Sequence, residues 1–254
     1  PCICCFKICT FRHHCCLVGR DFQPTTKTMQ ALSKADILIY NSTGMERWVE
    51  QATQAAANPK LVIVEASKDT DRISLTEADE IRAHGQYDPH TWLSLSCAQT
   101  EVKNIAEALA AADKTNADFY RKNAAEYNQK LQALLAAYQK KFSKLEQKDF
   151  VTGHAAFAYL CRDFGLQQQS IEDVFASGEP SAQNLAKLTA YCKEHNVKTI
   201  FVEEAVSPKT SETLAREVGA TTQEIYTIES SNGEKTYLTR MEENLDAIYK
   251  SLKK

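Results

Sequence analysis

Short apolar runs alternate with amphipathic helical stretches from Asp21 to the end of the chain. This alternation is typical of βαβ units, in which helices cover both faces of a parallel sheet. The runs that predict strands lie at residues 35–40, 60–64, 149–152, 170–174, 199–202 and 224–227. The pattern therefore predicts an α/β fold with two lobes, each built on a parallel sheet.

The longest helical stretch separates the two groups of strands and runs from about residue 115 to residue 146. It is rich in Ala, Leu, Lys, Gln and Glu and contains neither Gly nor Pro, which favours an uninterrupted helix. At 1.5 Å per residue it would extend on the order of 45 Å and join the lobes rigidly. We predict a first lobe at 1–114, a linker helix at 115–146, and a second lobe at 147–254 that closes with a helix at 237–252.

Ligands of open α/β sheets bind beyond the carboxyl ends of the strands, so we expect the site in a cleft between the two lobes. Three residues at such positions have side chains suited to metal ligation. His90 lies in the turn YDPHTW beside Asp88, whose carboxylate can orient its ring. His154 follows a strand in VTGHAAF and is predicted to open a helix, where Gly153 would let a ligand approach the backbone. Glu229 follows the last strand, and each of the three also fits an ordinary packed, capping or solvated role.

Further polar residues have two interpretations each. Glu203 and Glu204 follow the strand at 199–202 and are either groups that neutralise a nearby cation or surface residues.

Six of the nine cysteines fall within the first 16 residues. The other three are expected to be buried or lightly exposed thiols, namely Cys97, Cys161 and Cys192.

Composition narrows the classes of function. The chain has 254 residues, of which 43% are hydrophobic and 25% charged, and a formal net charge of -3, as is ordinary for a globular protein. It has no basic stripe interleaved with aromatic residues and no apolar run of about 20 residues, so we expect neither nucleic-acid binding nor a membrane-spanning helix. With eight glycines and no phosphate-binding loop, dinucleotide fingerprint, HExxH or GxSxG motif, the sequence does not predict an enzyme.

A series of segments resembles the metal-specific solute-binding proteins of bacterial ABC importers, in particular their zinc-uptake branch. In chain order these are DFQPT, LSKADILIYN, YDPHTWLS, VTGHAAFAYL, GEPS, IFVEEAVSPKTSETLAREVGA and IYTIES. The resemblance covers residues 21–254 and implies two lobes joined by a rigid helix, with a metal held between them for a membrane permease. Matched by motif, the ligands are His90, His154 and Glu229. A histidine at position 154 favours Zn²⁺ over Mn²⁺, because imidazole-rich sites suit zinc and manganese relatives have a carboxylate there.

The start of the chain departs from that family. Its first ligand, a histidine, normally stands where this chain has Arg20, whose guanidinium offers donors only and cannot ligate a cation. Residues 1–20 do not look like the family's first strand and helix, and we expect them to be a non-native or incomplete start. The alternatives are a Cys/His metal cluster or disulfides in an oxidising compartment. His84 is a candidate substitute for the missing ligand.

The predicted function is extracytoplasmic capture of Zn²⁺ and its delivery to an ABC permease, impaired by the loss of the first ligand. We expect a monomer, periplasmic or attached to the outer face of the membrane by a lipid anchor on a missing N-terminus. Two other functions stay open. One is a surface adhesin on the same fold, and the other is a metal-dependent hydrolase, for which Glu203 or Glu204 would be the general base.

Overall fold

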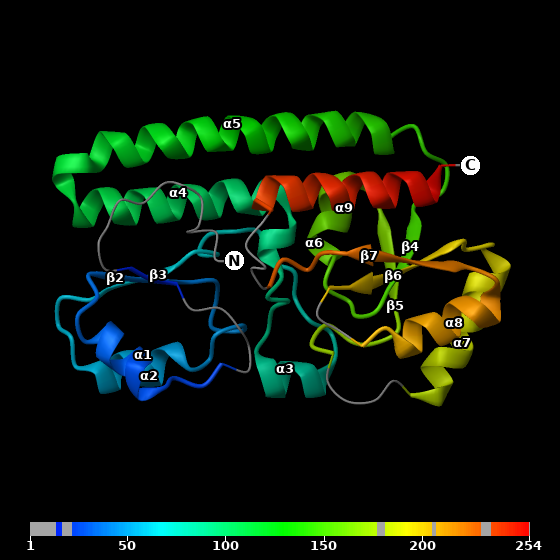
Figure 1. Ribbon diagram of the computed structural model, residues 1–254, viewed down its shortest axis with the longest axis horizontal. Helices are drawn as coiled ribbons and strands as arrows, with labels where there is room; N and C mark the ends of the chain where they lie inside the picture. Colours follow the sequence, from blue (N-terminus) through cyan, green and yellow to red (C-terminus); the bar gives the residue numbers. More distant parts are fainter. Residues whose placement is uncertain (1–13, 17–21, 177–180, 205–206, 230–234, 254) are drawn as a thin grey trace. The chain divides into compact units, whose positions relative to one another are not determined.

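The computed structural model describes residues 14–16, 22–176, 181–204, 207–229 and 235–253 (Figure 1). The chain divides into two compact units. The first consists of Pro1–Ala133 with Glu229–Tyr237, and the second of Leu134–Ile228 with Leu238–Lys254. Within the described residues, every helix is too short or too polar to span a membrane.

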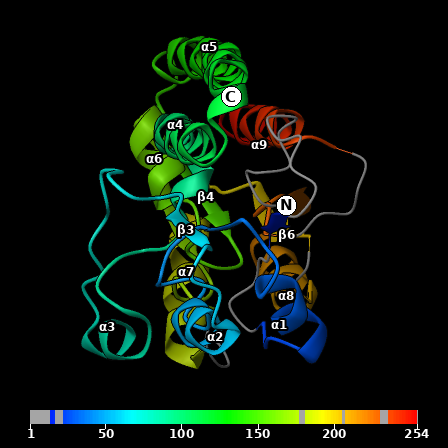
Figure 2. The same ribbon diagram turned by 90° about the vertical axis from the view of Figure 1, so that its left-hand side faces the viewer.

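The first unit contains a parallel sheet in the order β1-β2-β3. Its strands are β1 (His14–Cys16), β2 (Ile37–Tyr40) and β3 (Val62–Glu65). Its helices are α1 (Thr26–Leu32), α2 (Val49–Ala56), α3 (Ala78–His84) and α4 (Leu95–Ala112), and two 3₁₀ turns are η2 (Thr91–Leu93) and η3 (Lys114–Asn116). Figure 2 shows α4 on one side of β3 and α2 on the other.

The core of this unit is built on β2. Leu38 packs against Leu32 of α1 and against Val49 and Ala52 of α2. Ile37 and Leu38, which point to opposite faces of the sheet, are both fully buried. A parallel strand that is apolar on both faces needs helices on both faces, and α4 supplies the second layer.

The second unit contains a parallel sheet in the order β5-β4-β6-β7. Its strands are β4 (Asp149–Thr152), β5 (Gln167–Ser170), β6 (Thr199–Glu203) and β7 (Thr221–Ile225). Its helices are α6 (Ala158–Phe164), α7 (Ala182–Glu194), α8 (Lys209–Val218) and α9 (Tyr237–Leu252). Leu188 of α7 and Leu214 of α8 pack with Val151 and Ile200 on one face of this sheet. The ring of Phe150 meets those of Phe157 and Phe201 edge-on.

The long helix α5 (Ala117–Phe142) has 26 residues, or about 39 Å at 1.5 Å per residue. It begins in the first unit and ends in the second, so the predicted helical connection is confirmed. In the second unit its last turns contact α9. Tyr138 donates a hydrogen bond to Asp246 at 2.5 Å, and the ring of Phe142 packs edge-on against that of Tyr249.

The predicted central strands are confirmed, but one edge strand is misplaced. The strand expected at 170–174 is wrong, because β5 is Gln167–Ser170. The last strand begins earlier than expected, at Thr221. Both are edge strands with polar sequences. Their backbone groups pair with the neighbouring strand whatever the side chains, so no apolar run indicates where they begin and end. The helix predicted at 237–252 coincides with α9.

The chain's start also differs from expectation. Residues 1–20 do not look like the family's first strand, yet His14–Cys16 pairs in parallel with β2. Strand pairing uses backbone groups that every residue except Pro carries, so an irregular side-chain pattern does not prevent it. The rest of that segment, Arg20 included, lies outside the described residues.

The contact between α5 and α9 predicts a pH-dependent contribution to stability. The Tyr138 hydroxyl, and secondarily the Lys141 ammonium, hold the pKa of Asp246 below its usual range. A carboxylate with a depressed folded-state pKa stabilises the fold above its unfolded pKa and loses this contribution as pH falls through the folded value.

Asp246→Asn should therefore lower the melting temperature at pH 7, and the difference from wild type should shrink below about pH 4. Scanning calorimetry across this range measures it. The loss of melting temperature in the double variant Asp246→Asn, Tyr138→Phe should be smaller than the sum of the two single losses, because both substitutions remove the same hydrogen bond. A deficit that is constant with pH would contradict the account.

Candidate metal centre

The imidazole of His90 is fixed by a neighbouring carboxylate in the first unit. Asp88 accepts hydrogen bonds from the backbone N–H and the ring Nδ1 of His90, each at 2.8 Å. Both residues are buried. Because a carboxylate only accepts, Nδ1 carries the proton and Nε2 presents its lone pair. This carboxylate–imidazole arrangement is the one that orients histidine ligands of metals.

Buried polar side chains hold the turn around His90 in place. Asn41, the residue after β2, donates to the carbonyl of Pro89 at 2.8 Å. Thr91 donates to Glu101 at 2.6 Å, and Glu101 is fully buried. The sequence did not indicate Asn41 or Glu101. The one sequence signal for a role of Asn41 was its position at the carboxyl end of a predicted strand, where ligands of α/β sheets bind.

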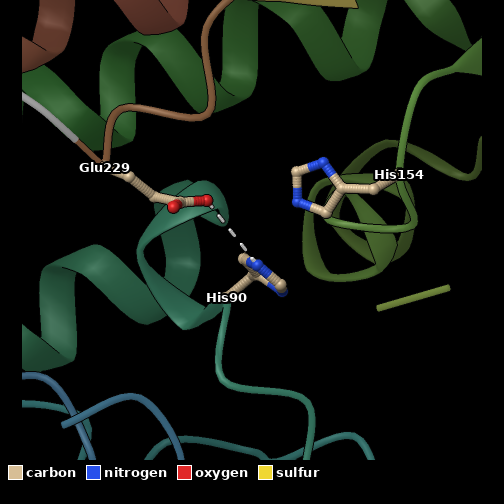
Figure 3. A group of neighbouring side chains, drawn as sticks. All are labelled: His90, His154 and Glu229. Carbon is tan, nitrogen blue, oxygen red and sulfur yellow. Dashed lines mark ion pairs between the residues drawn. The ribbon is translucent and has the colours of Figure 1, made fainter. Parts of the chain in front are cut away.

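Glu229 faces His90 in the same unit, as Figure 3 shows. Its Oε1 lies 3.9 Å from His90 Nε2. With Nδ1 protonated, both of these atoms are acceptors, and two acceptors repel unless a cation or proton lies between them. Two ligand atoms of one tetrahedral zinc ion lie about 3.4 Å apart. The pair is therefore close to the geometry that one ion would impose.

His154 is held at several points in the second unit. It lies in the loop between β4 and α6, so the prediction that it opens a helix is wrong. Glu203 accepts its backbone N–H at 3.0 Å and lies 3.4 Å from its ring Nδ1. Thr152 and Gln168 donate to its carbonyl at 2.7 and 2.8 Å. With Nδ1 next to a carboxylate, Nε2 is the atom suited to ligation.

Gly153 makes room for Glu203. A Cβ at Gly153 would lie 2.1 Å from Glu203 Oε2. The sequence predicted that a ligand approaches the backbone closely at this glycine, and the group that does so is the side-chain carboxylate of Glu203. Glu203 is buried, and its interpretation as a surface residue is wrong. A buried carboxylate is stable only when hydrogen-bonded, and the His154 backbone supplies a donor.

Glu204 contacts the segment that leads into Glu229. Its Oε2 accepts the N–H of Thr227 at 2.8 Å and its Oε1 accepts that of Ile228 at 3.1 Å. Ile228 has φ of 58°, a left-handed conformation that is rare for a β-branched residue and costs of order 1–3 kcal/mol. Hydrogen bonds to a charged group contribute about 1.5–3 kcal/mol each. The Glu204 carboxylate is thus able to offset the strain.

His84 is poorly placed to replace a missing ligand. It ends α3 and lines a polar cavity of about 300 Å³, together with Arg47, Arg72 and Arg82. Guanidinium groups repel a metal cation. Within the described part of the chain, His84 does not belong to any set of three or more His, Cys, Asp or Glu side chains close enough together to hold one metal ion.

The three cysteines after the first 16 residues are buried thiols, as predicted. Burial raises the pKa of Cys192 to about 11. Burial, and secondarily the charge of Asp149, raises the pKa of Cys161 still further. Because the thiolate rather than the thiol ligates metals, these residues are unsuited to metal binding.

The structure thus brings two of the three predicted ligands, His90 and Glu229, together within the first unit. His154 belongs to the second unit.

The contact between Gly153 and Glu203 predicts a steric effect. Gly153→Ala should displace the Glu203 carboxylate from His154 and lower the free energy of unfolding by about 1–3 kcal/mol, the usual range for overpacking. Gly44→Ala is the matched control, since its Cβ would meet nothing closer than 3.6 Å. Urea denaturation of both variants measures the difference, and equal stabilities would refute the assignment.

Known proteins share the sequence and the fold of this chain. The family model described as "Zinc-uptake complex component A periplasmic" matches residues 19–251. The chain is 41% identical over 245 residues to the high-affinity zinc uptake system protein ZnuA of Bacillus subtilis, covering 91% of this chain and 76% of that protein.

Two solved structures share the fold. A Zn(II)-bound variant of AdcAII of Streptococcus pneumoniae superimposes with a TM-score of 0.83 at 33% identity, covering 93% of this chain and 87% of the other. The laminin-binding protein Lmb of Streptococcus agalactiae, described as bifunctional with adhesin and metal transporting activity, gives 0.83 at 34% identity, covering 93% and 88%. The chain is extracytoplasmic, as predicted. It belongs to the zinc-uptake complex component A family, the zinc-type solute-binding proteins of ABC importers.

Proposed function

We propose that this protein captures Zn²⁺ through His90, His154 and Glu229 and delivers it to an ABC permease. The observation that carries the proposal is the approach of His90 Nε2 to Glu229 Oε1, 3.9 Å apart. Asp88 fixes the His90 tautomer, so a lone pair faces a carboxylate. A cation between the two atoms would turn this repulsion into two coordinate bonds.

His154 is proposed as the third ligand. Glu203 accepts its backbone N–H at 3.0 Å, and the same carboxylate lies 3.4 Å from the ring Nδ1. Two imidazoles and one carboxylate suit Zn²⁺ better than Mn²⁺, which prefers oxygen ligands. An ion bound by residues of both units would link them, as the sequence resemblance implies for the cleft.

The fourth coordination position is proposed to hold water or another side chain. Arg20 occupies the position where the resemblance places a histidine, and a guanidinium offers no lone pair to a cation. We therefore expect weaker zinc binding than in relatives with four protein ligands.

We propose that the protein catalyses no reaction. The family is one of transport components. Glu203 and Glu204, the acids considered as a general base, both accept backbone hydrogen bonds. We propose in addition that the protein is a monomer, either in the periplasm or lipid-anchored on the outer face of the cell membrane.

Adhesion is a second candidate function. It is favoured by the similarity to Lmb, which is described as both an adhesin and a metal transporter. Surface plasmon resonance against immobilised laminin tests it, and absence of binding by the zinc-loaded protein would remove this candidate.

The ligand assignment predicts that His154→Ala abolishes zinc binding. Isothermal titration at neutral pH should show a loss larger than the roughly 100-fold that removal of an outer partner causes. Zinc should raise the melting temperature of the wild type but not of the variant, because only a ligand that binds the folded state stabilises it.

His195→Ala is the matched control, since this exposed histidine of the same unit stacks on Tyr191. It should bind zinc like the wild type. Unchanged zinc binding by a folded His154→Ala protein would overturn the assignment.

A further inference from the structure

Three successive residues ahead of Glu229 are held by side chains of the second unit. Asn244 of α9 accepts the N–H of Tyr226 at 2.8 Å and donates to its carbonyl at 2.7 Å. Glu204 accepts the next two N–H groups, those of Thr227 and Ile228. The backbone of this segment is therefore fixed as far as Ile228, the residue before the carboxylate that faces His90.

Glu204 fixes the backbone that enters Ile228. Its carboxylate accepts two successive N–H groups, and the torsions between these two groups are the φ and ψ of Thr227. Ile228 is left-handed and buried, a conformation that its branched Cβ disfavours. The two hydrogen bonds therefore lie directly before a strained residue and set the direction in which the chain continues to Glu229.

We propose that Glu204 is a positioning residue for the zinc ligand Glu229 and acts by anchoring the N–H groups of the two residues ahead of it. The inference rests on the function proposed above. The second unit ends at Ile228 and the first resumes at Glu229. Loss of this anchor would let the φ and ψ of Thr227 change and rotate everything that follows, so the Glu229 carboxylate would turn away from His90 Nε2 while both residues stay intact.

Glu204→Gln is the direct test. Glutamine keeps the length of the side chain but has one acceptor oxygen for two N–H groups. We expect zinc affinity to fall about tenfold, the lower end of the effect of outer partners. Glu224→Gln is the matched control, because Glu224 is an exposed acid on the neighbouring β7 strand. Its affinity should equal that of the wild type.

A spectroscopic measurement separates positioning from general destabilisation. The visible spectrum of the Co²⁺-loaded protein reports the ligand set, so the spectrum of Glu204→Gln should shift toward that of Glu229→Gln. A purely structural role would lower the melting temperature of the metal-free protein and leave the Co²⁺ spectrum unchanged.

The possible outcomes are distinguishable. If the wild type binds neither Zn²⁺ nor Co²⁺, the proposed function fails. If it binds both and Glu204→Gln matches it in affinity and spectrum, the function stands and the positioning role is wrong. If Glu204→Gln does not fold, Glu204→Asp, which keeps the charge on a shorter side chain, should show an intermediate loss, and wild-type affinity there would equally refute the role.

Discussion

The Asp88 carboxylate decides what the imidazole of His90 offers to its surroundings. By accepting the Nδ1 proton at 2.8 Å, it leaves the lone pair of Nε2 facing the Glu229 carboxylate at 3.9 Å. Two acceptors in this arrangement favour a bound cation, and their separation is close to that of two ligands on one zinc ion. The buried hydrogen bonds of Asn41 and Thr91 hold the turn that carries His90 in this geometry.

Carboxylates that bind no metal shape the rest of the proposed site. Asp88 orients one imidazole, Glu203 lies against the other, and Glu204 holds the backbone ahead of Glu229. Each acid is hydrogen-bonded to the chain, which offsets the cost of removing its charge from water. Outer partners of this kind commonly contribute one to two orders of magnitude to metal affinity.

Much of the fold was predictable from sequence, because apolar runs identify strands that helices bury on both faces, as at β4 and β6. The same signal failed for β5, an edge strand with the sequence QQQS, since pairing there depends on the backbone alone. His90, Glu229 and Asp88 were found from their places beside strands and turns, and the structure brings them together. The roles of Asn41, Glu101 and Glu204, and the left-handed Ile228, were not predictable, because they depend on contacts between distant segments.

The central claim is that residues far apart in sequence bind one zinc ion. Anomalous diffraction at the zinc edge from crystals of the zinc-loaded protein tests it most directly. The account predicts a single strong peak within about 2.0–2.2 Å of His90 Nε2, His154 Nε2 and a Glu229 carboxylate oxygen. A peak at the cysteine-rich start of the chain, with none beside these three side chains, would contradict it.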